Sequence, residues 1–179
     1  METKVPFYNI VNVFLPGLIL IGSCMMLFLD DTKELVGRVT ILDSTGFEVL
    51  ITASCFAIAY EVGYVIFRLG AVAIEPALKK MFGWADYKDF IAAGKANENA
   101  HDKLEMLSRE YGYARTQITL FLALVALTGT CGKWWLMTVC LLCVALFTLT
   151  ARGHIKKIQI VMKQYLATNS NESEMVSNG

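Results

Sequence analysis

Residues Val5 to Leu29 form a run of 25 residues that contains no charged side chain. About 20 consecutive apolar residues are enough for a helix to cross the hydrocarbon core of a bilayer. Three further runs that are mostly apolar follow, over residues 47–74, 116–132 and 134–151. Because such runs take up roughly half of the chain, the sequence predicts an all-α, polytopic membrane protein with four transmembrane helices.

The composition agrees with a membrane protein. The hydrophobic share of 55% and the mean hydropathy of +0.49 exceed the usage of ordinary soluble domains. The formal net charge is zero, so no global field would attract nucleic acid. We therefore expect the lipid bilayer as a partner and no direct contact with nucleic acid. Residues 1–166 are predicted to form one membrane domain with a cytoplasmic arm over 75–115, and the polar residues 167–179 a disordered tail.

The distribution of Lys and Arg predicts the topology. Cytoplasmic loops of membrane proteins carry an excess of these residues. Twelve of them lie in the N-terminus, the segment 75–115 and the C-terminal region, against three in the segment 30–48 and at Lys133. Both termini and the long central segment are thus predicted to be cytoplasmic. The expected location is the inner (plasma) membrane.

The central segment is predicted to form a helical cytoplasmic stalk between spans two and three. As a helix, the run 47–74 would extend about 42 Å, against a hydrocarbon core of roughly 30 Å. Its last turns should therefore project from the bilayer and end near Pro76. A second helix is expected from about residue 102 to 130, because four residues make one apolar stripe at spacings of 3, 4 and 3: Leu104, Leu107, Tyr111 and Ala114.

Two features predict how the spans pack. The stretch 128–133, Thr-Gly-Thr-Cys-Gly-Lys, is typical of a tight turn and predicts an antiparallel hairpin of spans three and four. Small residues four positions apart, such as Ala59 and Gly63, permit close contact between membrane helices. That contact would lie within one subunit or between subunits, and we expect a homo-oligomer.

Glu61 is the residue that most suggests chemistry, because an ionisable group inside a membrane span is costly to insert. The predicted topology brings other polar residues to a similar depth in the inner half of the bilayer. One interpretation is that Glu61 pairs with Arg115 or Gln117 and holds two spans in register. The other is a proton- or ion-linked site in which Glu61 changes charge. The candidate intramembrane polar cluster consists of Asn12, Tyr60, Glu61, Tyr64, Arg115 and Gln117.

Signatures of common enzymes are absent from the sequence, which contains no HExxH, no GxSxG and no glycine-rich phosphate loop. His101 and His154 stand alone and are expected to be exposed to solvent. Cys140 and Cys143 lie inside an apolar run, where a reactive thiolate is disfavoured. We therefore predict a protein that is not an enzyme, with no catalytic, cofactor-binding or metal-binding residues.

Three stretches resemble a known group of proteins: 7–17 (Phe-Tyr-Asn-Ile to Phe-Leu-Pro-Gly), 60–76 (Tyr-Glu-Val-Gly-Tyr, Arg-Leu-Gly and Glu-Pro) and 107–116 (Leu-Ser-Arg-Glu-Tyr to Arg-Thr). Over residues 7–122 the chain is similar to small, poorly characterised multi-span proteins of bacteria, some found among antiphage defence genes. The resemblance implies a membrane effector, sensor or scaffold that works with a soluble cytoplasmic partner. The alternative is a small ion channel or transporter subunit with Glu61 in its polar pathway.

Overall fold

The computed structural model describes residues 10–28, 45–84, 87–96 and 98–177. These residues are helical apart from short turns and contain no β-strand, which confirms the all-α prediction for this part of the chain. The elements, with η for a π-helical turn, are η1 (Ile10–Phe14), α2 (Leu15–Leu27), α4 (Thr45–Leu69), η2 (Gly70–Ile74), α5 (Glu75–Phe82), α6 (Tyr87–Ala96), α7 (Glu98–Thr130) and α8 (Trp134–Ser177).

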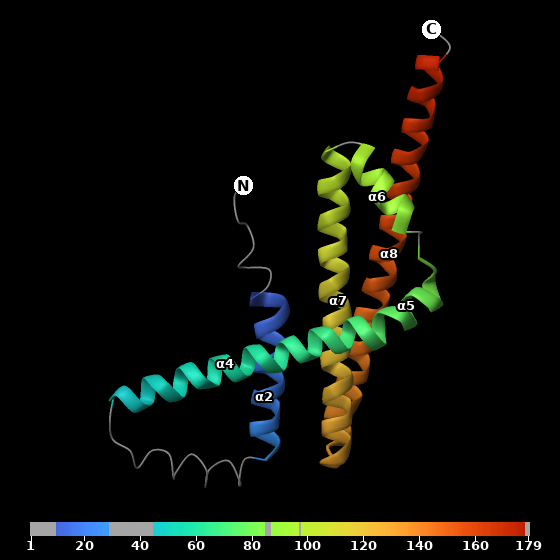
Figure 1. Ribbon diagram of the computed structural model, residues 1–179. Helices are drawn as coiled ribbons and strands as arrows, with labels where there is room; N and C mark the ends of the chain where they lie inside the picture. The colour runs from blue at the N-terminus through green and yellow to red at the C-terminus, as the bar shows by residue number, and fades with distance from the viewer. Residues whose placement is uncertain (1–9, 29–44, 85–86, 97, 178–179) are drawn as a thin grey trace.

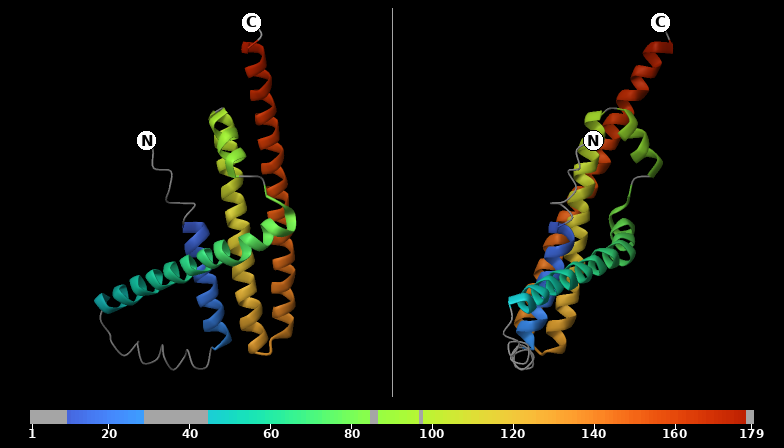
Figure 2. Two further views of the ribbon diagram at one scale, coloured as in Figure 1. Left: turned by 45° about the vertical axis from the view of Figure 1, so that its right-hand side comes forward. Right: turned by 60° about the vertical axis from the view of Figure 1, so that its left-hand side comes forward.

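Helix α7 lies at the centre of the molecule. Figure 1 shows α7 and α8 side by side and the shorter α2 next to the C-terminal half of α7, with the continuous path of α4, η2 and α5 crossing them obliquely. The two views of Figure 2 show the same crossing from other directions. Residues 114–120 of α7 are all buried, because helices pack around α7 on every side at this level.

Three helical segments are long and apolar enough to cross a membrane: Ile10–Leu27, Val49–Phe82 and Trp134–Ala167. They correspond to the first, second and fourth predicted spans. Helix α7 is not among them, because only its last part, residues 116–130, is apolar. These 15 residues fall short of the roughly 20 that a helix needs to cross. The four-span count therefore stays a prediction.

The predicted turn between α7 and α8 is present. The amide of Lys133 donates to the carbonyl of Thr128 at 2.9 Å, and the amide of Gly132 donates to that of Gly129 at 3.1 Å. This bonding pattern is the Schellman motif, which requires a left-handed residue after the helix. Gly132 supplies that residue with a φ of +67°. The two helices therefore run antiparallel as a hairpin (Figure 1).

Helix α8 continues well beyond the predicted span. The sequence predicts a disordered tail from residue 167, whereas the structure continues the helix through Ser177. Between His154 and Ser177 there is neither Gly nor Pro, so a helix that is already nucleated meets no strong breaker. At 1.5 Å per residue, α8 is about 66 Å long, more than twice the hydrocarbon core.

The end of the predicted span in α8 and the extension that follows it supply the partner for the apolar stripe of α7. Their residues Ala151, Ile155, Ile158 and Met162 are buried against Leu104, Tyr111 and Ala114 of α7. Ile118 of α7, Leu78 of α5 and Ala93 of α6 complete this cluster of buried residues. The stripe predicted for α7 is thus confirmed as a packing face. The predicted stalk combined this helix with the end of the second apolar run, whereas in the structure α8 contributes most of the residues buried against the stripe.

Each π-helical turn comes just before a proline. η1 ends two residues before Pro16, and η2 ends two residues before Pro76. Proline lacks an amide hydrogen, and its ring clashes with the carbonyl four residues earlier. A wider π turn moves this carbonyl away. We expected the helix to end near Pro76, but it continues to Phe82 because the π turn accommodates the proline.

The crossing of α2 and α4 is built on glycine. A Cβ placed on Gly17 would lie 1.8 Å from the carbonyl oxygen of Ala59 and 2.6 Å from the amide nitrogen of Gly63. A Cβ on Gly63 would lie 1.7 Å from the carbonyl oxygen of Val13. The two backbones are therefore in direct contact. The close helix contact predicted for Ala59 and Gly63 lies within one subunit.

Candidate functional site

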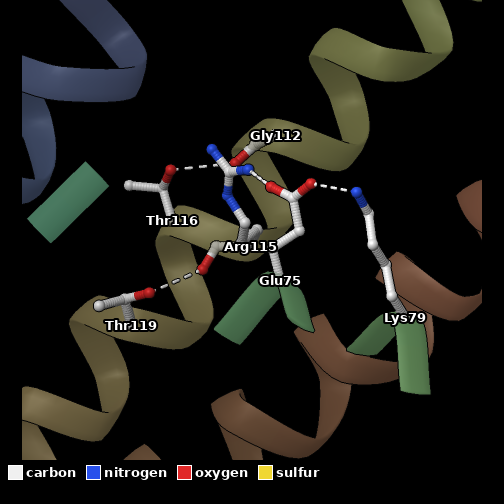
Figure 3. A network of polar contacts seen from close by, with 6 residues as sticks. All are labelled: Glu75, Lys79, Gly112, Arg115, Thr116 and Thr119. Carbon is white, nitrogen blue, oxygen red and sulfur yellow. Dashed lines mark hydrogen bonds and ion pairs between the residues drawn. The ribbon is translucent and has the colours of Figure 1, made fainter. Parts of the chain in front are cut away.

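A partly buried ion pair joins α5 to α7. One terminal nitrogen of Arg115 donates to Oε2 of Glu75, and Nζ of Lys79 lies 2.7 Å from Oε1 of the same carboxylate (Figure 3). The side chains of Arg115 and Glu75 are 10% and 22% exposed. Charges this far removed from water are costly unless they are paired. The pair therefore fixes the first turn of α5 against the middle of α7.

The surroundings of Arg115 hold its side chain in place. Gly70 makes room for it: a Cβ there would lie 2.8 Å from Oγ1 of Thr119 and 3.5 Å from Cγ of Arg115. The Phe67 ring lies below the guanidinium, 5.2 Å from its carbon. The hydroxyls of Thr116 and Thr119 donate to carbonyls of their own helix, at 2.9 and 3.0 Å, and so do not compete for Glu75 (Figure 3).

A cavity of about 380 Å³ lies beside the ion pair, between η1, α4, α5 and α7. Residues from each of these elements line it. Three of the lining residues each leave one buried polar atom without a hydrogen-bond partner: Oδ1 of Asn12, Oη of Tyr111 and Nε of Arg115. Buried polar atoms are normally satisfied by a protein or water partner. This concentration of unsatisfied atoms on one cavity marks it as the candidate functional site.

Tyr111 remains a neutral hydroxyl in this environment. Burial raises the pKa of Tyr111 to about 12, and the negative charge of Glu75 adds to this effect, while Arg115 opposes it. At neutral pH the O–H is thus available as a hydrogen-bond donor. Its ring also packs on Trp84, with the ring centres 5.2 Å apart.

Four of the six residues predicted to form the polar cluster do line this cavity: Asn12, Tyr60, Tyr64 and Arg115. Gln117 is buried in α7 but is not among the lining residues. Glu61 is exposed on α4 and also lies outside the cavity lining. Most of the predicted cluster thus lies around one cavity, but Glu61, on which the prediction was centred, does not.

The partner expected for Arg115 was wrong. Arg115 pairs with Glu75, fourteen positions after Glu61. The face of α4 explains the difference, because Tyr60 and Tyr64 line the cavity together with Arg115, whereas Glu61 between them is exposed and lies outside the cavity lining. Arg68 does not reach Glu61 either. Its Nε donates to the hydroxyl of Tyr64 at 2.8 Å.

Glu75 and Tyr111 are site residues that the sequence analysis missed. The sequence did contain a signal for Glu75. This residue directly follows the apolar run 47–74, and Arg115, which has the opposite charge, directly precedes the run 116–132. The predicted topology puts these two boundary charges at the same membrane surface, where opposite charges are natural partners. Tyr111 was assigned only to the apolar stripe. The spacing of the stripe predicts that the Tyr111 ring is buried, but it gives no information about the hydroxyl group.

His154 is less exposed than predicted. Its Nδ1 lies 3.2 Å from Oε2 of Glu110, and its side chain is only 15% exposed. A second cavity, of about 570 Å³, lies beside this pair between η1, α7 and α8. Within the residues that the structure describes, no group of three or more His, Cys, Asp and Glu side chains is arranged to hold a metal ion.

Comparisons with known proteins do not assign the chain to a family. No protein-family model matches the chain, and no curated protein and no solved structure matches it.

Proposed function

We propose that the chain is a non-enzymatic integral membrane protein of the bacterial inner membrane, with four spans and both termini in the cytoplasm. Three helices long and apolar enough to cross a membrane support this proposal. The fourth span would be the apolar end of α7, which α8 accompanies along its length. The excess of Lys and Arg in the segment 75–115 and near the termini supports the orientation.

Reporter fusions test this topology. Alkaline phosphatase, which is active only outside the cytoplasm, should be active when fused after Lys33 and silent when fused after Asn97 or Gly179. The expected difference is about tenfold or more, because the positive-inside asymmetry is large. β-Galactosidase fused at the same positions provides the reciprocal control. Phosphatase activity at Asn97 would overturn the orientation.

We further propose that the protein acts as the membrane effector, sensor or scaffold of an antiphage defence system, together with a soluble cytoplasmic partner. The observation that carries this proposal is the Glu75–Arg115 pair. It joins the two ends of the helical arm, at the start of α5 and in the middle of α7, at the point where the arm meets the apolar helices. A partner that binds the arm would thereby act on the membrane helices. The similarity to multi-span proteins near defence genes supports the biological setting.

Association of several copies is part of this proposal. Ala53 and Ala57 lie exposed on the free half of α4. Large apolar residues, among them Phe56 and Ile58, are exposed beside them. A small-residue face flanked by apolar side chains suits contact with another membrane helix.

Phage challenge tests the defence role and separates it from the channel alternative. Cells that express the chain with its neighbouring genes should plate phage less efficiently than cells with an empty vector. Glu61→Gln should retain this protection, since Glu61 is exposed and lies outside the cavity. A channel that depends on the charge of Glu61 would instead lose both protection and ion leakage in a normally expressed Glu61→Gln protein. Absence of protection by the unaltered chain against every phage would contradict the defence role.

A further inference from the structure

The cavity beside the Glu75–Arg115 pair is built like a ligand site. Its volume of about 380 Å³ falls within the roughly 300–1,000 Å³ typical of small-molecule pockets. Aromatic side chains form much of its wall, among them Tyr60, Tyr64 and Trp84. Such sites combine apolar walls with a few polar groups that fix the orientation of the ligand.

The charges around the cavity favour an anion. Arg109 and Arg115 both line it, whereas Glu75 is the only carboxylate among the residues that the structure places on its wall. The two oxygens of Glu75 are already engaged by Arg115 and Lys79. Arg109 is itself paired with Glu105, so it adds no unpaired charge. Arg115 and Lys79 together carry two positive charges against the one negative charge of Glu75, and one positive charge is therefore left in excess beside the cavity.

The unsatisfied atoms specify the hydrogen bonds that a ligand would make. The Nε of Arg115 and the neutral hydroxyl of Tyr111 are both donors without an acceptor. The Oδ1 of Asn12 is an acceptor without a donor. A ligand that satisfies all three carries anionic oxygens together with a hydroxyl or ammonium group. Phosphate esters whose organic part carries a hydroxyl or ammonium group, such as glycerol phosphates, have this combination, and arginine is well suited to bind their oxygens.

We propose that the cavity between η1, α4, α5 and α7 binds a phosphate ester, with Arg115 and Tyr111 donating hydrogen bonds to its oxygens. The aromatic wall contacts the organic part of the ligand. This chemistry has two sources: a soluble organic phosphate from the cytoplasm, or the headgroup of an anionic phospholipid. The inference goes beyond the proposed function and does not depend on the defence role.

Trp84 provides a reporter for binding, because it lines the cavity. The chain has three tryptophans. The other two, Trp134 and Trp135, are 67% and 69% exposed, so their replacement by Phe should leave the packing unchanged. The full chain with these two replacements, in a neutral detergent, is titrated with glycerol 3-phosphate or AMP in one arm. In the second arm, phosphatidylglycerol is added to the micelles, with diacylglycerol of the same acyl chains as the control that lacks phosphate.

The expected result is a saturable change in Trp84 emission in one arm, and the responding arm identifies the source of the phosphate. Native mass spectrometry counts bound molecules directly, so that a silent fluorophore is not mistaken for absent binding. Tyr111→Phe should weaken binding by about tenfold or more, since it removes a hydrogen bond to a charged group. Tyr113→Phe, on the same helix but outside this cavity, should bind as the parent does.

Tyr111→Phe should also fold normally, because without ligand its buried hydroxyl has no partner to lose. No bound phosphate ester in either arm by either measurement overturns the proposal, and so does equal affinity of Tyr111→Phe and its parent. Neither outcome changes the result of the phage challenge. A failure of this inference is therefore distinguishable from a failure of the proposed function.

Discussion

Gly17→Ala is expected to separate α2 from α4 and to lower the free energy of unfolding by about 3 kcal/mol or more. The added Cβ would lie 1.8 Å from the carbonyl oxygen of Ala59, which belongs to a helix backbone and has no rotamer to change. The gain in helix propensity from Gly to Ala is at most about 1 kcal/mol. The steric cost is larger, so the variant is destabilised.

Gly22→Ala is the matched control, since it lies one and a half turns further along the same helix and a Cβ there meets nothing within 4 Å. Thermal unfolding in detergent micelles, followed by circular dichroism, should show a large decrease in Tm for Gly17→Ala and an unchanged or slightly higher Tm for Gly22→Ala. Gly63→Ala should behave like Gly17→Ala. Equal unfolding of Gly17→Ala and Gly22→Ala would show that α2 and α4 do not cross at these glycines.

Arg115→Gln is expected to destabilise the protein by about 2–3 kcal/mol, because it leaves the partly buried carboxylate of Glu75 with Lys79 alone. Glu75→Gln should cost a similar amount, since it leaves the guanidinium without its acceptor. The double variant should lose less than the sum of the two, because neither charge then remains unpaired. Chemical or thermal unfolding of the three variants in one detergent measures this coupling.

The pair of Glu105 and Arg109 is the control for charge removal. Both side chains are 48% exposed and lie one turn apart on α7. Exposed pairs of this kind contribute at most about 1 kcal/mol, so Glu105→Gln should unfold nearly as the parent does. If Arg115→Gln were as mild as Glu105→Gln, the ion pair would not be what holds α5 on α7.

The helices were predictable because their signals are local. The apolar runs, the stripe of α7 and the Gly132 turn each depend on residues close together in the sequence. The partner of Arg115 was not predictable in this way. It depends on the direction in which α4 crosses α7, and this direction is set by backbone contact at Gly17 and Gly63. Apolar periodicity carries no information about such an angle.

The site was predictable only in part for the same reason. Asn12, Tyr60, Tyr64 and Arg115 were grouped by depth, and the structure gathers them around one cavity. Depth did not indicate which side of α4 faces inward, so Glu61 was included and Glu75 was left out. The helical continuation of α8 was also missed. A polar composition indicates that a segment is not buried in a hydrophobic core, but it does not by itself exclude a helix.

The π-helical turn η2 has a consequence for how the chain tolerates changes in length. A π turn holds one residue more than an α-helical path between the same two points. Loss of one residue from Gly70–Ile74 would be absorbed by conversion to an α-helical turn, and Glu75 would still face Arg115. The same deletion inside α7 would rotate all later residues by about 100°. Homologous chains of unequal length are therefore best aligned with their gap at this joint.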